Sequence, residues 1–118
     1  ENIFFHGSVN REKLLKDYSE YDILLNTTEY DNFPMSIVEA GINKLIVITS
    51  NVGGIRNLYN ENEVVYFQSG DIESMKNILW KVINNIPEYK GYSKNLYEKV
   101  MTFNWQNVRQ QWLNTLSI

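Results

Sequence analysis

The sequence predicts an α/β fold in which a mainly parallel sheet carries helices on both faces. Short apolar segments at residues 3–5, 23–25, 45–49 and 64–67 alternate with helix-like segments, which is the pattern of strands joined by crossover helices. Such crossovers are right-handed and leave consecutive strands parallel. The clearest strand is 45–49, which is rich in β-branched residues and is predicted to be buried on both faces. With 118 residues, the chain is predicted to form one domain, residues 1–118.

The helices are predicted from apolar residues that recur every three or four positions and from residues that favour helix starts. They cover residues 11–21, 34–42 and 55–59, a segment that follows Asp71, residues 87–101, and a last segment that follows Asn104. Asn10, Asp71 and Asn104 are the predicted N-caps. The three tryptophans and eight tyrosines are most simply core and helix-packing residues, because their spacing is helical. If Trp105 or Trp112 is instead exposed, we expect self-association.

The composition excludes several classes of function. The formal net charge is −3 with no basic stripe, so nucleic acid is not an expected partner. The chain has no Cys and a single His, which rules out disulfides and thiolate metal sites and leaves little for zinc. We expect no metal and no cofactor. The apolar runs are too short to span a bilayer and no signal segment opens the chain, so a cytosolic location is expected.

The most informative stretch is residues 31–40, which places Asp31 and Glu39 on either side of a helix start at Pro34. Met35 and Ser36 share the helix face of Glu39, because residues three and four apart are neighbours. The free N–H groups of a first helical turn favour an anion such as a phosphate. Carboxylates accept hydrogen bonds from hydroxyl groups, as on a ribose or a sugar. The combination suits a sugar nucleotide.

Three loops follow predicted strands and should open on the same edge of the sheet, where ligands of such folds bind. They are residues 6–8, 27–34 and 50–54. The adjacent glycines Gly53 and Gly54 let a backbone approach a ligand closely. Plainer interpretations stay open: two solvated acids, an ordinary glycine turn, and a His6 bonded to backbone. Arg56 fits either a phosphate contact or an exposed position at a helix start.

These features together resemble the C-terminal, donor-binding domain of the family 4 (group 1) retaining glycosyltransferases, which have a GT-B fold. The resemblance covers nearly the whole chain and rests on the acid-x7-acid signature from Asp31 to Glu39, with Phe-Pro and Glu-Ala inside it. Gly53 and Gly54 follow in register, and Phe103-Asn104-Trp105 resembles the start of the family's final helix. It implies a Rossmann-like sheet, the truncated C-terminal half of a GT-B fold. The domain would lack its first strand and helix.

The resemblance also implies residue roles. Glu39 corresponds to the acid that binds the ribose hydroxyls, and Asp31 to the acid against the hydroxyls of the donor sugar. The segment from Phe33 to Ile37, comprising Phe33, Pro34, Met35, Ser36 and Ile37, corresponds to the part that meets the sugar and the diphosphate. His6 and Gly7 lie in a turn that corresponds to a loop near the base. Two positions depart from the family pattern: Asp31 is commonly Glu, and Asn57 stands where Glu is frequent.

Two hypotheses follow. In the first, the chain is the donor-binding part of a retaining enzyme that transfers a hexosyl-type sugar to a glycan or lipid-linked acceptor in polysaccharide biosynthesis. Its N-terminal domain, in cis or as a partner chain, would supply the acceptor site, and the parent protein could contact a membrane peripherally. We expect the 118-residue chain alone to be inactive, because it begins with Glu1 inside a strand-like segment, after the family's pyrophosphate-binding Arg and Lys. In the second, it is a non-catalytic binding or regulatory module that pairs with another chain.

Overall fold

The computed structural model describes residues 2–116 as an α/β fold around a three-stranded parallel sheet. The strands are β1 (Ile23–Asn26), β2 (Ile46–Ser50) and β3 (Val65–Phe67), in the order β1-β2-β3. Ile23 lies opposite Ile46, and Ile48 opposite Val65. The predicted fold class is therefore confirmed.

The described part of the chain contains six helices. They are α1 (Arg11–Tyr18), α2 (Met35–Ile42), α3 (Gly53–Leu58), α4 (Ile72–Ile83), α5 (Ile86–Met101) and α6 (Trp105–Leu116). Asn10, Asp71 and Asn104 each accept a hydrogen bond from the backbone N–H three residues later, at 2.8 to 2.9 Å. All three predicted N-caps are confirmed. No helix within residues 2–116 combines the length and the apolar character needed to cross a membrane.

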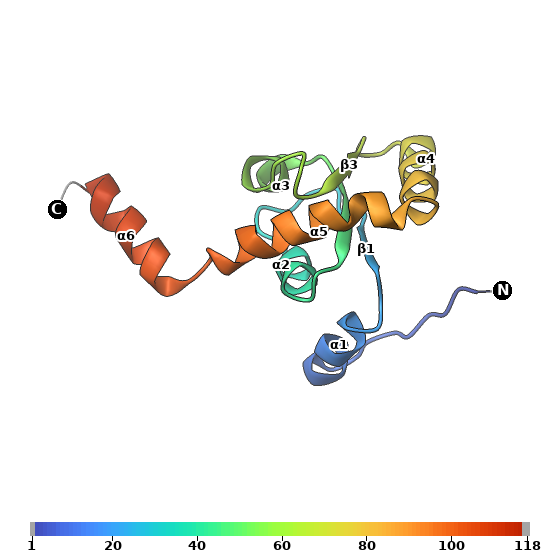
Figure 1. Ribbon diagram of the computed structural model, residues 1–118, viewed down its shortest axis with the longest axis horizontal. Helices are drawn as coiled ribbons and strands as arrows, with labels where there is room; N and C mark the ends of the chain where they lie inside the picture. The colour runs from blue at the N-terminus through green and yellow to red at the C-terminus, as the bar shows by residue number, and fades with distance from the viewer. Residues whose placement is uncertain (1, 117–118) are drawn as a thin grey trace.

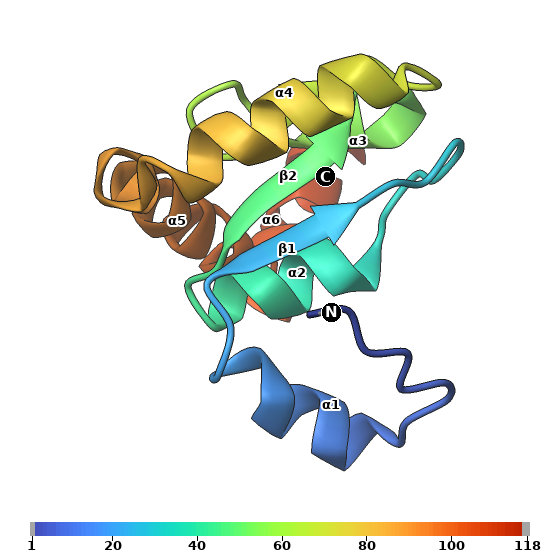
Figure 2. The same cartoon turned by 90° about the vertical axis from the view of Figure 1, so that its right-hand side faces the viewer.

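The sheet is covered on both faces, and its two apolar layers meet at β2. Figure 2 shows α4 on one side of the strands and α2 on the other. All five residues of β2 are buried, as predicted for 45–49. Val47 packs into the layer beneath α2 and α3, whereas Ile46 and Ile48 pack into the layer that includes Val82 of α4. Helix α5 contributes to both layers, because Leu96 lies in the first layer and Tyr89 in the second.

The N-terminal segment differs from its prediction. Residues 3–5 form no strand, and Ile3, Phe4 and Phe5 are 77%, 76% and 97% exposed. The segment extends from the start of α1 and does not join the sheet (Figure 1). An apolar run becomes a strand only when another strand offers it backbone partners. Among the described residues β1 pairs with β2 alone, so the prediction of a buried strand at 3–5 is wrong here.

Two further predictions need correction. Helix α1 ends at Tyr18 instead of Tyr21, where the Ser19 hydroxyl donates to the carbonyl of Lys16 at 2.7 Å and closes the last turn. The tryptophans are not core residues: Trp80, Trp105 and Trp112 are 70%, 76% and 62% exposed. No residue of α6 is buried, and this helix projects from the end of α5, away from the sheet (Figure 1). Helical spacing identified an apolar face without identifying a partner for it.

Candidate functional site

The candidate site lies beyond the carboxyl ends of β1 and β2, where the chain carries a layer of polar contacts. The Asn26 amide donates to the hydroxyl of Thr49 at 3.1 Å and so joins the ends of the two strands. The hydroxyl of Ser50, which is buried, donates to the backbone carbonyl of Thr28 at 2.5 Å. These bonds hold the loop after β1 against the sheet, because buried hydroxyl and amide groups must find partners. The loop then leads directly to Asp31.

The turn at Asp31 sets the start of α2. Its Oδ1 accepts a hydrogen bond from the N–H of Phe33 at 3.0 Å, a local bond typical of Asp in turns. Pro34 is the N-cap of α2, with ψ at 117°, and the helix begins at Met35, one residue later than predicted. No side chain caps this first turn. Oδ2 of Asp31 accepts no hydrogen bond within residues 2–116.

The two glycines hold the start of α3 against the turn at residues 31–33. Gly53 has φ at +37°, a conformation that favours glycine. A β-carbon on Gly54 would lie 2.4 Å from the carbonyl oxygen of Asn32 and 2.5 Å from its Cα. The start of α3 and the turn at residues 31–33 are therefore in close backbone contact, and the two loops meet at one edge of the sheet.

We predict that Gly54→Ala destabilises the protein by about 1–3 kcal/mol, because the added methyl group overpacks a backbone contact that cannot move freely. The matched control is Gly91→Ala in α5, where a β-carbon meets nothing within 4 Å. That change should stabilise by about 0.5–1 kcal/mol, because alanine favours a helix interior. Urea unfolding followed by circular dichroism measures both. Equal stability of Gly54→Ala and the wild type would contradict the contact with Asn32.

Glu39 lies deeper in the structure, between α2 and α1. It is 7% exposed, and its Oε1 lies 2.8 Å from Nη1 of Arg11, the first residue of α1. Burial raises the pKa of the Tyr18 hydroxyl, and the neighbouring carboxylate of Glu39 raises it further. A buried carboxylate requires such partners. Both come from α1, which the sequence indicated only as an amphipathic helix.

The other predicted residues of this stretch divide into core and surface. Ile37 is fully buried, and its N–H donates to the carbonyl of Pro34 at 3.2 Å. Met35 is 50% exposed, and Ser36 is half-buried. Phe33, which is 45% exposed, packs against Phe103 with ring centroids 5.5 Å apart. The aromatic motif that precedes α6 is thereby joined to the turn at Asp31.

The N-terminal turn and Arg56 are not brought into this group. His6 and Gly7 lie in the exposed segment before α1, and Gly7 has φ at +65°. No hydrogen bond or ion pair in residues 2–116 joins them to Asp31 or Glu39. Arg56 pairs with Glu61 at 2.6 Å and lies over the ring of Tyr66 at 4.7 Å. Arg56 lies in the last turn of α3 and not at the helix start that was predicted, and this pairing favours an exposed surface Arg over a phosphate contact.

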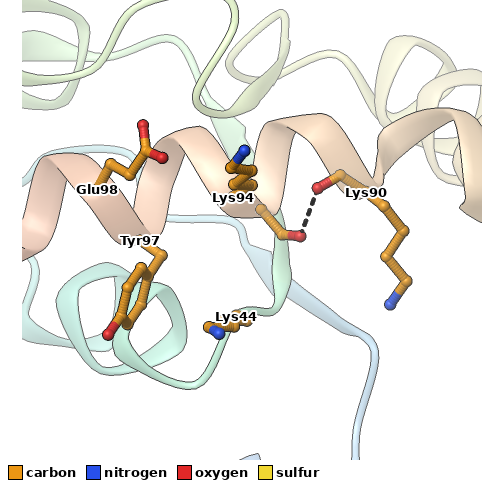
Figure 3. Close-up of a pocket in the computed structure, with 6 residues that line it drawn as sticks. Lys44, Lys90, Lys94, Tyr97 and Glu98 are labelled. Atoms are coloured by element: carbon orange, nitrogen blue, oxygen red, sulfur yellow. Dashed lines mark hydrogen bonds between the residues drawn. The ribbon is translucent and has the colours of Figure 1, made fainter.

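A hollow of about 480 Å³ lies away from the candidate site, beside α5 and Lys44. Lys44 precedes β2, so this hollow is at the amino ends of the strands, opposite the candidate site. Figure 3 shows Lys94 and Glu98 on one side of α5, and Tyr97 and Lys90 on the other. The Lys44 ammonium lies 4.8 Å from the centre of the Tyr97 ring. Because these charged groups diverge, the hollow offers no convergent binding site.

A smaller hollow of about 260 Å³ lies at the carboxyl edge, on the α4 side. It is lined by Thr27, Glu29, Phe67, Gly70, Asp71, Ile72 and Met75. Within residues 2–116, no three His, Cys, Asp or Glu side chains form a group that could hold a metal ion.

Comparison with known proteins identifies the family. Residues 1–99 match the family described as "Glycosyl transferases group 1". The chain belongs to the group 1 glycosyltransferases. This confirms the resemblance derived from the Asp31 to Glu39 signature and the glycines that follow it. No curated protein matches the chain.

Solved structures of two other proteins have the same fold as this chain. Sucrose-phosphate synthase from Thermosynechococcus elongatus aligns with a TM-score of 0.80 at 23% identity over 97% of this chain. HepE from Anabaena, solved with UDP-glucose, aligns with a TM-score of 0.73 at 21% identity over 86% of the chain. The group 1 glycosyltransferase chain spans 29% of each of these two proteins. At this identity the likeness establishes the GT-B type of fold.

The structure adds three residues that sequence reasoning missed at the site: Arg11, Asn32 and Phe103. Arg11 contacts Glu39, Asn32 contacts Gly54, and Phe103 contacts Phe33. The sequence did mark Phe103, because this residue opens the motif that resembles the start of the family's final helix. The other two contacts join separate elements, and no local pattern marks them.

Proposed function

We propose that this chain is the donor-binding part of a retaining glycosyltransferase, which holds a nucleoside-diphosphate sugar at the carboxyl edge of its sheet. The observation that carries the proposal is the family match over residues 1–99. Support comes from the edge itself, where the turn at Asp31, the uncapped start of α2 and the glycine turn lie together. HepE was solved in complexes with UDP and with UDP-glucose. We therefore take UDP-glucose as the first donor to test.

Each part of the donor has a chemical counterpart at this edge. Glu39 binds the ribose hydroxyls through its carboxylate, and Oδ2 of Asp31 accepts from hydroxyls of the sugar. The N–H groups of the first turn of α2 receive the diphosphate, because no side chain occupies them and the helix dipole favours an anion there. Phe33, Pro34, Met35 and Ser36 line this turn. Ile37 closes this turn, because its N–H donates to the carbonyl of Pro34 and its side chain is buried in the core.

The parent protein then transfers a hexosyl-type sugar to a glycan or lipid-linked acceptor in the assembly of a polysaccharide. The acceptor hydroxyl must be held against the anomeric carbon while the diphosphate leaves, so positioning and charge stabilisation carry most of the catalysis. We propose that an N-terminal domain or partner chain supplies the acceptor half. The 118-residue chain alone is expected to bind donor without transferring sugar.

The test is calorimetric titration of the chain with UDP-glucose and UDP, beside GDP- and ADP-sugars. We expect saturable binding, and Glu39→Gln should weaken it about 10- to 100-fold, because hydrogen bonds to a charged group are worth about 1.5–3 kcal/mol. Glu98→Gln, which lies beside the hollow at the other end of the sheet, is the matched control and should bind as the wild type does. Circular dichroism verifies that each variant is folded.

Two results would overturn parts of the proposal. Undiminished binding by folded Glu39→Gln removes the ribose role of Glu39. A wild-type chain that binds no sugar nucleotide contradicts the donor site itself and favours the non-catalytic module. Sugar transfer by the chain alone would contradict its expected dependence on an acceptor half.

A further inference from the structure

We propose that Arg11 is a positioning residue of the nucleotide-sugar site, which holds Glu39 so that one carboxylate oxygen faces the ribose. This inference rests on the proposed function and assigns a role to a residue outside the family signature. Its basis is the 2.8 Å contact between Arg11 Nη1 and Glu39 Oε1. A carboxylate has two oxygens, and Arg11 takes one of them. The ribose hydroxyls then bind Oε2.

The burial of the two partners is unequal, and this indicates which one depends on the other. The Glu39 side chain is 8% exposed, whereas the Arg11 side chain is 69% exposed. Arg11 could remain hydrated without its partner. Glu39, in contrast, has lost most of its hydration through burial, and only a paired cation compensates for that cost. The ion pair therefore serves mainly to hold the buried Glu39 carboxylate in one orientation. An exposed pair that served only to join two helices would bury neither carboxylate nor guanidinium.

Helix α1 fixes Arg11 in this position. The side chain of Asn10 accepts from the N–H of Lys13 at 2.8 Å, which defines the helix start immediately before Arg11. Two turns later, Tyr18 is buried within reach of the Glu39 carboxylate, whose charge raises the pKa of this tyrosine. Arg11 and Tyr18 of α1 thus both lie next to the carboxylate of Glu39 in α2. A buried polar group with defined partners has one orientation in place of several.

The charge of Arg11 also suits the ligand. A nucleoside diphosphate is an anion, and it must approach an edge that already carries Asp31 and Glu39. The guanidinium offsets the charge of Glu39 at close range, where the Coulomb interaction is largest. Because most of the Arg11 side chain is exposed, it lies at the rim of the site, next to the segment that contains His6 and Gly7.

The test is a double-mutant cycle on UDP affinity, with Arg11→Gln, Glu39→Gln and the double variant of the 118-residue chain. We expect Arg11→Gln to weaken UDP binding about tenfold in the wild type and at most twofold when Glu39 is already Gln, because Arg11 acts through Glu39. Arg11→Lys should recover part of the loss, since it keeps the charge but not the fork of donors. Lys13→Gln, whose partner is Asp17, is the control on the same helix and should leave affinity unchanged.

Titration with uridine separates positioning from a direct contact. If Arg11 positions Glu39, uridine and UDP lose affinity by the same factor, because both carry the ribose. A loss confined to UDP means that Arg11 contacts the diphosphate, and this overturns the positioning role. An equal loss in both Glu39 backgrounds, or no loss, overturns it too. If the wild-type chain binds neither probe, the proposed function fails first, and the role of Arg11 fails with it.

Discussion

Ile37→Ala lowers the free energy of unfolding by about 2–5 kcal/mol and leaves the UDP affinity of the folded chain unchanged. The side chain of Ile37 is fully buried in the layer that includes Val47 and Ile55. Truncation removes apolar contacts and leaves a cavity that the surrounding β-sheet cannot fill. The N–H of Ile37 donates to the carbonyl of Pro34, a bond that does not depend on the side chain. The start of α2 should therefore keep its geometry.

The matched control is Met35→Ala, two residues earlier on the same helix. Met35 is 50% exposed, so its truncation should change stability by no more than about 0.5 kcal/mol. Urea unfolding gives both stabilities, and calorimetry at a temperature where each variant is folded gives the affinities. A fully folded Ile37→Ala that has lost UDP affinity would show that the core face of α2 contributes to ligand binding beyond its packing.

The sheet was predictable because its signal is local. β2 consists of consecutive apolar and β-branched residues bounded by polar ones, and such a run fits a central strand covered on both faces. The N-caps were predictable for the same reason, since an Asn or Asp side chain bonds to a backbone group three residues away. These features need no knowledge of which elements meet.

The errors at residues 3–5 and at the tryptophans share one physical cause. An apolar run specifies that a segment gains by burial, but not that a partner is available. Phe5 is 97% exposed and Trp105 is 76% exposed because no described element covers them. The candidate site likewise has a part that is local in the sequence and a part that depends on packing between elements. The stretch from Asp31 to Glu39 could be located from sequence, whereas the contacts of Glu39 with Arg11 and of Gly54 with Asn32 arise only when separate elements pack.

Alkaline pH should destabilise the protein through two tyrosines near α3. Burial raises the pKa of Tyr59 to about 12 and the pKa of Tyr66 to about 12, against an ordinary value near 10. Between these values the unfolded chain loses protons that the folded chain retains, so the free energy of unfolding falls as pH rises from about 10 to about 12. Below pH 10 this stability is fully present. For Tyr59, which is 2% exposed, the loss is at most about 2–3 kcal/mol.

Replacing each tyrosine by phenylalanine should change the stability at pH 7 in different directions. Tyr59 is 2% exposed, and its hydroxyl has no hydrogen-bond partner among the described residues. Tyr59→Phe should therefore leave stability at pH 7 unchanged or raise it by about 1 kcal/mol, and should reduce the alkaline loss. The single O–H of Tyr66 is shared between the carbonyls of Tyr59 at 2.7 Å and Ile55 at 3.1 Å. Tyr66→Phe should cost about 1–3 kcal/mol at pH 7, because it removes the donor to both carbonyls.

Urea unfolding at pH 7, 10 and 11.5, extrapolated to zero denaturant, measures these differences for the wild type and both variants. The decisive quantity is the change in unfolding free energy between pH 10 and 11.5. It should be smaller in each variant than in the wild type, since each has lost one group that binds its proton more tightly when folded. A wild-type stability that stays constant over this interval would mean that neither hydroxyl is held in a buried environment. A Tyr59→Phe variant as unstable as Tyr66→Phe at pH 7 would mean that the Tyr59 hydroxyl has a stabilising partner.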